Sequence, residues 1–471
     1  MINIIAKMLI LQSYLYICTL IINIGTIKIR TKMKVLKFGG TSVGSAQRMK
    51  EVAKLITDGE QKIVVLSAMS GTTNTLVEIS DYLYKKNPEG ANEIINRLEA
   101  KYKQHVNELY STDEYKQKTQ EFIKAQFDYI RSYTKDIFTL FEEKVILAQG
   151  ELISTNMVTN YLQEQGVNAI LLPALEFMRT DKNSEPDPVY IKEKLAAQLE
   201  IHPDAEIYIT QGFICRNAYG EIDNLQRGGS DYTASLIGAA VNASEIQIWT
   251  DIDGMHDNDP RIVDKTSPVR HLHFEEAAEL AYFGAKILHP TCVQPAKYAN
   301  IPVRLLNTME PTAPGTLISN DTEKGKIKAV AAKDNITAIK IKSSRMLLAH
   351  GFLRKVFEIF ESYQTSIDMI CTSEVGVSVS IDNTKHLNEI LDDLKKYGTV
   401  TVDQDMCIIC VVGDLEWENV GFEAKALDAM RDIPVRMISF GGSNYNISFL
   451  IREEDKKKAL QSLSDHLFNN K

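Results

Sequence analysis

An apolar strand that runs straight into a glycine-rich turn and then a helix restricts this chain to a small set of folds. Residues 35–38 read as the strand, and the turn is Lys37-Phe-Gly-Gly-Thr-Ser-Val-Gly44. From Met49 to Ile56, apolar side chains then recur at the spacing of one helix face. A strand, a tight turn and a helix in this order predict the opening unit of a mainly parallel α/β fold.

The alternation of strands and helices continues well beyond this unit. Further β-branched runs predict strands at residues 63–66, 169–172, 206–212 and 246–250. Residues 76–145 are charged, aromatic-rich and strongly helical, which predicts a helical layer or insertion beside the sheet. Residues 319–328 turn polar and charged, and this change predicts a domain boundary.

Beyond that boundary the pattern changes to short alternating strands and amphipathic helices. Alternation at residues 339–342 and 377–381 and helical stripes at 352–363 and 387–394 outline a small β-α-β-β-α unit. A similar order recurs between residues 407 and 467, which predicts two ferredoxin-like copies. The expected domains are an N-terminal extension (1–32), the α/β unit (34–320), and the two small units (330–402 and 403–471).

Length and composition support several domains and exclude one class of partner. At 471 residues the chain exceeds what a single hydrophobic core holds, so two or three domains are expected. The formal net charge of −9 gives no general attraction to phosphate backbones. No block of Lys and Arg with interleaved aromatic residues is present, so nucleic-acid binding is not expected.

Six scattered cysteines are too sparse for a disulfide framework and fit a reducing, cytoplasmic compartment. Cys407 and Cys410 form a CxxC, but they lie in an apolar run that reads as a strand. Residues three apart on a strand point to opposite faces, so a redox or metal-binding pair is not expected.

Residues 1–32 precede the first predicted strand and form an N-terminal extension. Twenty uncharged residues between Lys7 and Lys28 are long enough to span a bilayer, but Gln12 and Ser13 interrupt them and no cleavage site is evident. A second candidate start, Met33, opens directly into the first strand. We therefore interpret residues 1–32 as the product of a misplaced start codon. Detection of Met1 by intact-mass analysis of the native protein would contradict this.

The glycine-rich turn that follows the first strand is a candidate phosphate site. Bare glycines let backbone N–H groups approach phosphate oxygens, and the following helix N-terminus adds its positive dipole end. The turn is neither a Walker A loop nor a GxGxxG fingerprint, because Lys37 precedes the glycines. The alternative is a tight strand-to-helix turn with an exposed lysine.

A second cluster, Leu225-Gln-Arg-Gly-Gly-Ser-Asp-Tyr232, again places glycines before a helix. The planar guanidinium of Arg227 suits a substrate carboxylate, and Asp231 is suited to orient phosphates or a magnesium ion. The alternative is a surface Arg–Asp pair that caps a helix.

A third cluster follows the strand at residues 246–250. It comprises Thr250-Asp-Ile-Asp-Gly254, Asp259-Pro-Arg261 and Phe283-Gly-Ala-Lys-Ile-Leu-His-Pro290. Carboxylates and hydroxyls at the carboxyl end of a strand are where ligands bind in open α/β sheets. His289 precedes a proline and is expected to end a helix rather than to catalyse.

Together these clusters closely resemble the aspartokinase family, a branch of the amino-acid kinase superfamily. The resemblance runs from Lys34 to nearly the C-terminus and rests on KFGGTSVG, SAMSGTTN, GELIST, QRGGSDY, WTDIDG, DPR, FGAKILHP, GFLRKVF, TSEV and FGGSNYNISFLI. It implies a three-layer amino-acid kinase domain followed by two ferredoxin-like ACT domains. It also implies transfer of the γ-phosphoryl group of ATP, with Mg²⁺, to the side-chain carboxylate of L-aspartate, the first step toward lysine, threonine and methionine.

The resemblance assigns roles to individual residues. Lys37, Gly39 and Gly40 are expected to hold the β- and γ-phosphates, and Asp231 is expected to organise the transfer. Expected aspartate contacts are Thr73, Glu151, Arg227 and Ser230. Expected nucleotide contacts are Thr250, Asp251, His256, Arg261, Lys286 and Ile287. Two positions depart from the family pattern: His256 replaces a common tyrosine, and Gln226 replaces the glycine before the arginine.

Elementary chemistry agrees with these roles. The side-chain carboxyl of aspartate, with a pKa of about 3.9, is already ionised at neutral pH, so no strong base is needed. The barrier is repulsion between two anions, which Lys37, Mg²⁺ and backbone N–H groups would neutralise. Glu151 would pair with the substrate ammonium and Arg227 with its α-carboxylate.

The two small units are expected to bind an amino-acid effector, with L-lysine as the expected ligand, between copies of a homodimer or a dimer of dimers. Positions that match a lysine-binding pattern are Met346, Gly351, Phe352, Leu353, Ser366, Ile367, Asp368, Ser373 and Glu374. Asp368 and Glu374 suit an ammonium group, and Gly351 begins a helix whose free N–H groups suit a carboxylate. Ala349 stands where the pattern often has serine. The alternative is a purely structural dimerisation domain.

Two competing functions stay open at this point. One is another kinase of the superfamily that acts on glutamate, acetylglutamate or a nucleotide, against which GELIST and QRGGSDY argue. The other is a non-catalytic amino-acid sensor, against which Lys37, Arg227 and Asp231 argue. A fused homoserine dehydrogenase is not expected, because the chain ends at Lys471.

Overall fold

The computed structural model describes residues 33–135, 137–225, 228–284, 289–343, 346 and 350–468. The predictions for residues 1–32, Gln226, Arg227, Lys286, Ile287 and Ala349 lie outside this part of the chain. Among the helices that it contains, none combines the length and the apolar character needed to cross a membrane.

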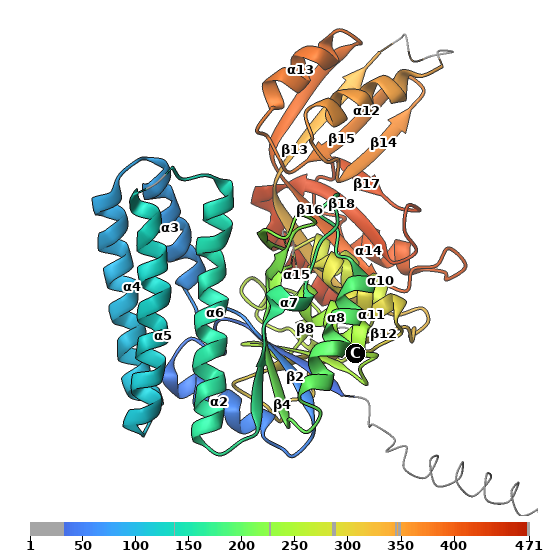
Figure 1. Ribbon diagram of the computed structural model, residues 1–471. Coiled ribbons are helices and arrows are strands. Elements are labelled where there is room, and N and C mark those ends of the chain that lie inside the picture. Colours follow the sequence, from blue (N-terminus) through green and yellow to red (C-terminus); the bar gives the residue numbers. More distant parts are fainter. Residues whose placement is uncertain are drawn as a thin grey trace, which may run out of the picture.

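The N-terminal two thirds of the chain are built on an eight-stranded, mainly parallel sheet with the order β10-β12-β11-β7-β1-β2-β4-β3 (Figure 1). Its strands are β1 (Lys34–Phe38), β2 (Lys62–Leu66), β3 (Ala169–Leu172), β4 (Ile207–Gln211), β7 (Ile246–Thr250), β10 (His271–His273), β11 (Val303–Asn307) and β12 (Thr316–Ser319). β1 pairs in parallel with β2 on one side and with β7 on the other. The order in which successive strands are added to the sheet therefore reverses beside β1. Open α/β sheets bind ligands at such a reversal point.

Helices cover both faces of this sheet, so successive residues of its strands are buried alternately on one face and on the other. Val35 and Ile63 face one core, and Leu36 and Val64 face the other. Helices that pack with the first core include α7 (Ala174–Phe177), α8 (Pro188–Ile201), α9 (Gly229–Val241), α10 (Phe274–Tyr282) and α11 (Gln294–Tyr298). The other face is covered by α2 (Ala46–Ile56), α3 (Thr72–Tyr84), α4 (Pro88–Leu109), α5 (Asp113–Ser132) and α6 (Leu140–Glu164).

The predicted helical layer is present as a bundle of α3, α4, α5 and α6 to one side of the sheet (Figure 1). α6 is the bundle helix that borders strands of the sheet. Short elements complete this part: β5 (Ile214–Arg216), β6 (Ile222–Asn224), β8 (Met255–His256), β9 (Pro268–Val269), and the 3₁₀ helices η1 (Tyr133–Lys135) and η2 (Pro290–Val293). The predicted α/β fold class is confirmed.

The C-terminal third forms one six-stranded antiparallel sheet with the order β14-β15-β13-β16-β18-β17. Its strands are β13 (Ile327–Lys342), β14 (Met369–Ser373), β15 (Gly376–Ile381), β16 (Thr399–Gly413), β17 (Met437–Ser439) and β18 (Asn446–Arg452). Its helices are α12 (Phe352–Ser362), α13 (Leu387–Lys395), α14 (Phe422–Ala429) and α15 (Lys456–Leu467), with the 3₁₀ turn η4 (Glu453–Asp455).

Two ferredoxin-like units share the long strands β13 and β16. Residues 337–342 of β13 pair with β15 and with the start of β16, whereas residues 327–333 pair with the end of β16. The register shifts between Lys333 and Ala338, and the left-handed residues Asn335 (φ 60°) and Asp405 (φ 54°) lie at this bend. Each unit has its own apolar core.

The predicted limits 330–402 and 403–471 therefore divide one continuous sheet, because the cut falls within β16. The first unit is nested inside the second, which also takes the first half of β13. Sequence patterns count strands one after another and do not reveal that one strand serves two units. The predicted opposite orientation of Cys407 and Cys410 is confirmed, since these cysteines pack in different cores.

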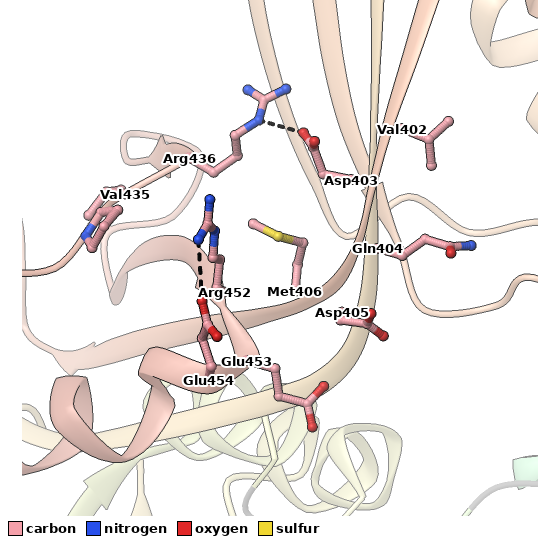
Figure 2. A pocket seen from close by; sticks show the side chains of 11 residues that line it. Val402, Asp403, Gln404, Asp405, Met406, Val435, Arg436, Arg452, Glu453 and Glu454 are labelled. Carbon is pink, nitrogen blue, oxygen red and sulfur yellow. Dashed lines mark hydrogen bonds and ion pairs between the residues drawn. The ribbon is translucent and has the colours of Figure 1, made fainter.

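A cavity of about 940 Å³ opens beside the bend of β16 (Figure 2). Arg436 donates to Asp403 (2.8 Å) and Arg452 pairs with Glu454 (3.2 Å) at its rim. This cavity lies in the C-terminal sheet, away from the strand ends that carry the predicted substrate residues.

Candidate active site

An ion pair between Lys37 and Asp231 stands at the centre of the predicted site. Lys37 is near the end of β1, and Asp231 is in the first turn of α9. The Lys37 Nζ lies 2.6 Å from the Asp231 Oδ1, and the two side chains are only 11% and 15% exposed. The carboxylate therefore fixes the position of the ammonium group beside the glycine-rich turn.

The glycine-rich turn is held against the neighbouring strand ends by its backbone. The Gly39 amide donates to the Trp249 carbonyl (3.3 Å), and the Gly40 carbonyl accepts from the Ser70 amide (3.1 Å). A Cβ atom on Gly40 would lie 2.7 Å from the Ala68 carbonyl oxygen, so only glycine fits there. No described residue accepts a hydrogen bond from the Gly40 amide, which leaves this N–H for an anion.

Two helices begin at this edge of the sheet. In their first turns the Thr72 amide donates to the Met69 carbonyl (2.9 Å) and the Asp231 amide to the Gly228 carbonyl (3.0 Å). No described residue accepts from the Thr73 and Ser230 amides. α3 starts after Gly71 (φ 82°) and α9 after Gly228 (φ 72°), and neither helix has a side-chain cap. The Ser67 hydroxyl at the end of β2 donates to the Ser230 hydroxyl in α9 (2.9 Å), which joins the two regions. Thr73 lies half-buried in the first turn of α3. Uncapped helix N-termini attract anions through their N–H groups and dipoles.

Glu151 supplies a buried carboxylate with spare hydrogen-bonding capacity. Its Oε1 accepts from the Ala68 amide (3.2 Å), whereas its buried Oε2 has no partner among the described residues. Burial raises the pKa of Glu151 to about 8. A buried, unpaired carboxylate oxygen is costly unless a cation binds it. The arrangement therefore suits a ligand that carries an ammonium group.

Sequence reasoning named no role for Ser67, Ala68 or Gly150, although all three shape the site. The Ser67 carbonyl accepts from the Ser154 hydroxyl (2.8 Å), and the Ala68 amide binds Glu151. A Cβ atom on Gly150 would lie 2.8 Å from the Ala68 Cβ, so this glycine lets α6 approach the loop. The motifs SAMSGTTN and GELIST contain these residues and were the available signal.

The described residues of the predicted nucleotide pocket lie at the end of β7 and in the segment that follows. The Thr250 hydroxyl accepts from the Ile252 amide (3.2 Å), and Asp251 is exposed. The His256 Nδ1 lies 2.9 Å from the Thr266 hydroxyl. Arg261 is turned toward Asp259, with its Nη2 2.7 Å from the Asp259 Oδ2.

His289 caps the start of η2, where its side chain accepts from the Thr291 amide. Residues 285–288, directly before it, lie outside the described residues. The expectations that His289 ends a helix and does not catalyse therefore stay predictions.

Asp368, the central residue of the predicted effector site, is already bound by groups of its own chain. Its side chain is 0% exposed, and its Oδ1 lies 2.7 Å from both the Lys333 Nζ and the Tyr282 hydroxyl. Lys333 also pairs with Asp382 (2.9 Å). The buried Oδ2 has no partner among the described residues, and burial raises the pKa of Asp368. Tyr282 belongs to α10, so this cluster joins the kinase part to the C-terminal sheet.

The other predicted effector residues fall into two groups at opposite ends of β14. Ser366 and Ile367 precede the strand together with Asp368, and Ser373 and Glu374 stand at its end. Near that second end, Gly351 (φ 84°) begins α12, with Phe352 buried, Leu353 exposed and Met346 half-buried. At about 3.4 Å per residue, the two ends of β14 are on the order of 17 Å apart, longer than one free amino acid.

Comparison with known proteins identifies the chain. The model of the amino acid kinase family matches residues 32–307, and an ACT domain model matches residues 409–467. Aspartokinase 1, chloroplastic, of Arabidopsis thaliana is 35% identical over 465 residues, which cover 93% of this chain and 80% of that protein. The chain belongs to the aspartokinase family.

Solved structures of family members agree with the fold. The crystal structure of E. coli aspartokinase III in complex with aspartate and ADP (R-state) has a TM-score of 0.81 and 32% identity, and covers 93% of this chain and 100% of that chain. The same enzyme in complex with lysine and aspartate (T-state) has a TM-score of 0.77 and 33% identity, with coverages of 93% and 99%. As in other aspartokinases, a kinase domain is thus joined to ACT domains in one chain.

The structure thus brings Lys37, Glu151, Ser230 and Asp231 to one edge of the kinase sheet, with Thr73 in the adjacent helix turn. Arg227, Lys286 and Ile287 fall outside the described residues. The individual roles stay predictions. Among the described residues, no group of three His, Cys, Asp or Glu side chains is placed to hold a metal ion.

Proposed function

We propose that this aspartokinase-family chain transfers the γ-phosphoryl group of ATP to the side-chain carboxylate of L-aspartate, giving 4-phospho-L-aspartate. The observation that carries the proposal is the buried Oε2 of Glu151, which has no partner among the described residues and lies at the sheet edge near Lys37 and the N-termini of α3 and α9. The Glu151 carboxylate suits the ammonium group of an amino-acid acceptor. Lys37 and the uncapped N-termini of α3 and α9 suit the phosphates of a phosphoryl donor.

In this mechanism the protein positions two anions and neutralises the charge between them. The acceptor carboxylate is ionised at neutral pH, so no general base is required. Lys37, held by Asp231, and the N-terminal amides of α3 and α9 would stabilise negative charge on the transferring group. Glu151 would bind the substrate ammonium, and we assign its α-carboxylate to Arg227. The two contacts would align the acceptor oxygen with the phosphorus atom.

Mg²⁺ would enter with the nucleotide and offset the charge of the phosphates. Asp231 is the carboxylate that we assign to this region. Thr250, Asp251, His256 and Arg261 are assigned to the nucleotide, together with Lys286 and Ile287.

We further propose that L-lysine binds the C-terminal sheet between two copies of the chain and inhibits the enzyme. The two groups of predicted effector residues are too far apart along β14 to hold one amino acid. β14 is an edge strand, and its Ile370 and the following Val375 are exposed large apolar residues.

β17 of the same chain approaches the outer edge of β14, with the Cys371 Sγ 3.1 Å from the Ile438 carbonyl oxygen, so we propose contact through the exposed residues of β14 instead of strand pairing. A second copy packed antiparallel against these residues would place Asp368 of one chain beside Ser373 and Glu374 of the other.

Aspartate-dependent consumption of ATP, with the acyl phosphate trapped as the hydroxamate, tests both proposals. The same assay with glutamate and acetylglutamate tests the competing kinase function, and titration with lysine, threonine and methionine tests the effector. We expect turnover with aspartate only and inhibition by lysine. Turnover with another acceptor would contradict the substrate, and no ADP release with aspartate would favour a non-catalytic sensor.

A further inference from the structure

A second ion pair, Lys144 with Asp223, lies between α6 and β6 and has no role in the site described above. The Lys144 Nζ is 2.7 Å from the Asp223 Oδ1, and the side chains are 21% and 10% exposed. Such a pair is poorly screened by solvent, and the loss of one partner leaves the other charge uncompensated. It is therefore stronger than a surface ion pair.

The helical partner of this pair shares a face of α6 with the predicted ammonium-binding residue. Lys144 and Glu151 are seven residues apart in α6, which is about two turns of an α-helix. Side chains at this spacing point in nearly the same direction. Glu151 contacts the Ala68 amide while Lys144 contacts β6, so the two residues fix the same helix against two neighbouring segments.

The strand partner belongs to a small hairpin that leads into α9. β5 and β6 form a separate two-stranded sheet in which Asp223 is opposite Cys215. The hairpin continues through Leu225, whose amide donates to the Phe213 carbonyl (2.8 Å). The Phe213 amide in turn donates to the Thr233 hydroxyl of α9 (3.0 Å). A movement of the hairpin would therefore move the start of α9.

The position of this hairpin depends on what anchors it. On the side of α7, the Arg216 side chain donates to the Leu175 carbonyl (3.1 Å) and the Arg216 amide donates to the Met178 carbonyl (2.9 Å). Lys144 provides such an anchor from α6, the helix that carries Glu151.

The contacts α6 to β6, β6 to β5, and β5 to α9 thus form a chain from Glu151 to the helix that carries Ser230 and Asp231. The ion pair is thus one link between the sides of the acceptor site; another is Ser67, which binds the hydroxyls of Ser154 in α6 and Ser230 in α9.

We propose that Lys144 and Asp223 are positioning residues that set the separation between Glu151 and the N-terminal turn of α9. They thereby determine the affinity for the amino-acid acceptor more than the rate of phosphoryl transfer or the affinity for ATP. This inference rests on the proposed function.

The test compares steady-state kinetics of Lys144→Met, Asp223→Asn and the exchanged double variant Lys144→Asp/Asp223→Lys. We expect each single change to raise KM for aspartate about tenfold, which corresponds to about 1.4 kcal/mol of binding free energy. Turnover and KM for ATP should change much less. Partial recovery of KM for aspartate in the exchanged variant is expected, because that variant restores opposite charges.

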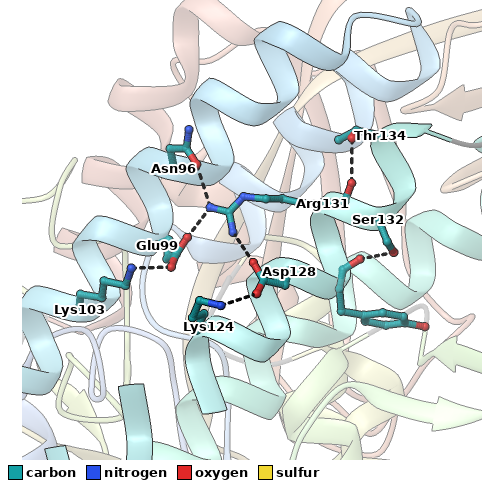
Figure 3. A network of polar contacts seen from close by, with 9 residues as sticks. Asn96, Glu99, Lys103, Lys124, Asp128, Arg131, Ser132 and Thr134 are labelled. Carbon is teal, nitrogen blue, oxygen red and sulfur yellow. Dashed lines mark hydrogen bonds and ion pairs between the residues drawn. The ribbon is translucent and has the colours of Figure 1, made fainter. Parts of the chain in front are cut away.

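A control of similar burial is the pair of Arg131 with Glu99 in the helical bundle, where Arg131 also pairs with Asp128 and Glu99 also pairs with Lys103 (Figure 3). These side chains are 27% and 8% exposed, close to the values of the Lys144–Asp223 pair. Arg131→Met should lower the melting temperature by a similar amount and leave KM for aspartate unchanged. The comparison separates lost positioning from lost stability.

Three outcomes would overturn the inference. If the wild-type enzyme is active and Lys144→Met has an unchanged KM for aspartate, the inference fails while the proposed function stands. The same would follow if Arg131→Met raised this KM equally, or if kcat and KM for ATP changed as much as KM for aspartate. A wild-type chain with no aspartate-dependent turnover would instead overturn the proposed function and this inference with it.

Discussion

The kinase sheet and the C-terminal sheet assemble their predicted binding residues in different ways. Lys37, Glu151 and Asp231 come from β1, α6 and α9, yet they gather at one edge because the carboxyl ends of parallel strands share that edge. In the antiparallel C-terminal sheet, the predicted effector residues occupy both ends of the edge strand β14. From this difference we propose an acceptor site within one chain and an effector site that needs a second copy.

The key carboxylates of the two regions also differ in their hydrogen-bond and ion-pair partners. Glu151 and Asp368 are both buried acids with raised pKa values and one unpaired oxygen among the described residues. Within the described part of the chain the Glu151 carboxylate pairs with no cation, whereas Asp368 already binds Lys333 and Tyr282. Under the proposed roles, a substrate would bind the unpaired oxygen of Glu151, while an effector would share Asp368 with groups that join the two regions.

The largest expected effect lies in the kinase sheet. Lys37→Ala should lower turnover by about a hundredfold or more, because it removes the cation that offsets charge in the transferring group. Rate measurements at saturating aspartate and ATP check this. Lys62→Met is the control, since Lys62 is a buried lysine of the neighbouring strand β2 that pairs with Asp58. Near-normal turnover of Lys37→Ala, or an equal loss in both variants, would contradict the role of Lys37.

The next largest effect is expected at Glu151, the residue proposed to bind the ammonium group of aspartate. Glu151→Gln should raise KM for aspartate roughly tenfold to a hundredfold, because a hydrogen bond to a charged partner contributes about 1.5–3 kcal/mol. The change should leave KM for ATP nearly constant. Titrations of Glu151→Gln and wild type with aspartate and with ATP measure this. A KM for aspartate within twofold of wild type would show that Glu151 does not bind the ammonium group.

The raised pKa of Glu151 gives a dependence of stability on pH. In the unfolded chain this carboxyl ionises near 4.5, but in the folded chain it stays protonated up to about 8. The folded state therefore holds more protons between these values, and stability is lost as pH rises through this window. The melting temperature of Glu151→Gln relative to wild type should rise from pH 5 to pH 8.

Aspartate should oppose this loss by pairing its ammonium with the ionised Glu151. The stabilisation of the wild-type protein by aspartate should thus increase toward pH 8, as thermal melts with and without aspartate can measure. A difference between wild type and Glu151→Gln that stays constant across the window would contradict the buried, unpaired carboxylate.

The smallest effect belongs to the C-terminal sheet. Tyr282→Phe removes one donor from Asp368 and leaves the carboxylate more available to an ammonium group. The lysine concentration for half-inhibition should fall about fivefold, which corresponds to about 1 kcal/mol for one hydrogen bond. Tyr298→Phe serves as the control, because Tyr298 is an exposed tyrosine of α11. An unchanged or higher lysine requirement in Tyr282→Phe would contradict the shared use of Asp368.

Sequence patterns predicted much of the kinase sheet because each strand is a short buried apolar run. The strands at 169–172 and 246–250 were predicted with the bounds that the structure gives. Glu151 could be placed near the substrate only through the family motif, since nothing in its own helix shows that Ala68 lies opposite. The pairing of Lys37 with Asp231 depends on tertiary contacts that no local pattern contains.

The C-terminal sheet was harder to predict for a related reason. The bend near Asn335 and Asp405 lets β13 and β16 serve both units, and a polar interruption of this kind reads as a turn in the sequence. The contact of Asp368 with Tyr282 likewise joins residues that are distant along the chain. Local periodicity identifies elements and their buried faces, but it does not show which elements share a strand or a carboxylate.

The contrast between a complete acceptor site and a divided effector site is tested most directly with Ile370→Lys, which places a charge on the exposed edge strand β14. Formation of aspartyl hydroxamate with and without lysine would be measured alongside the molar mass in solution. We predict a monomer that keeps aspartate-dependent turnover and no longer responds to lysine. A monomer that lysine still inhibits as it inhibits the wild-type chain would contradict the divided effector site.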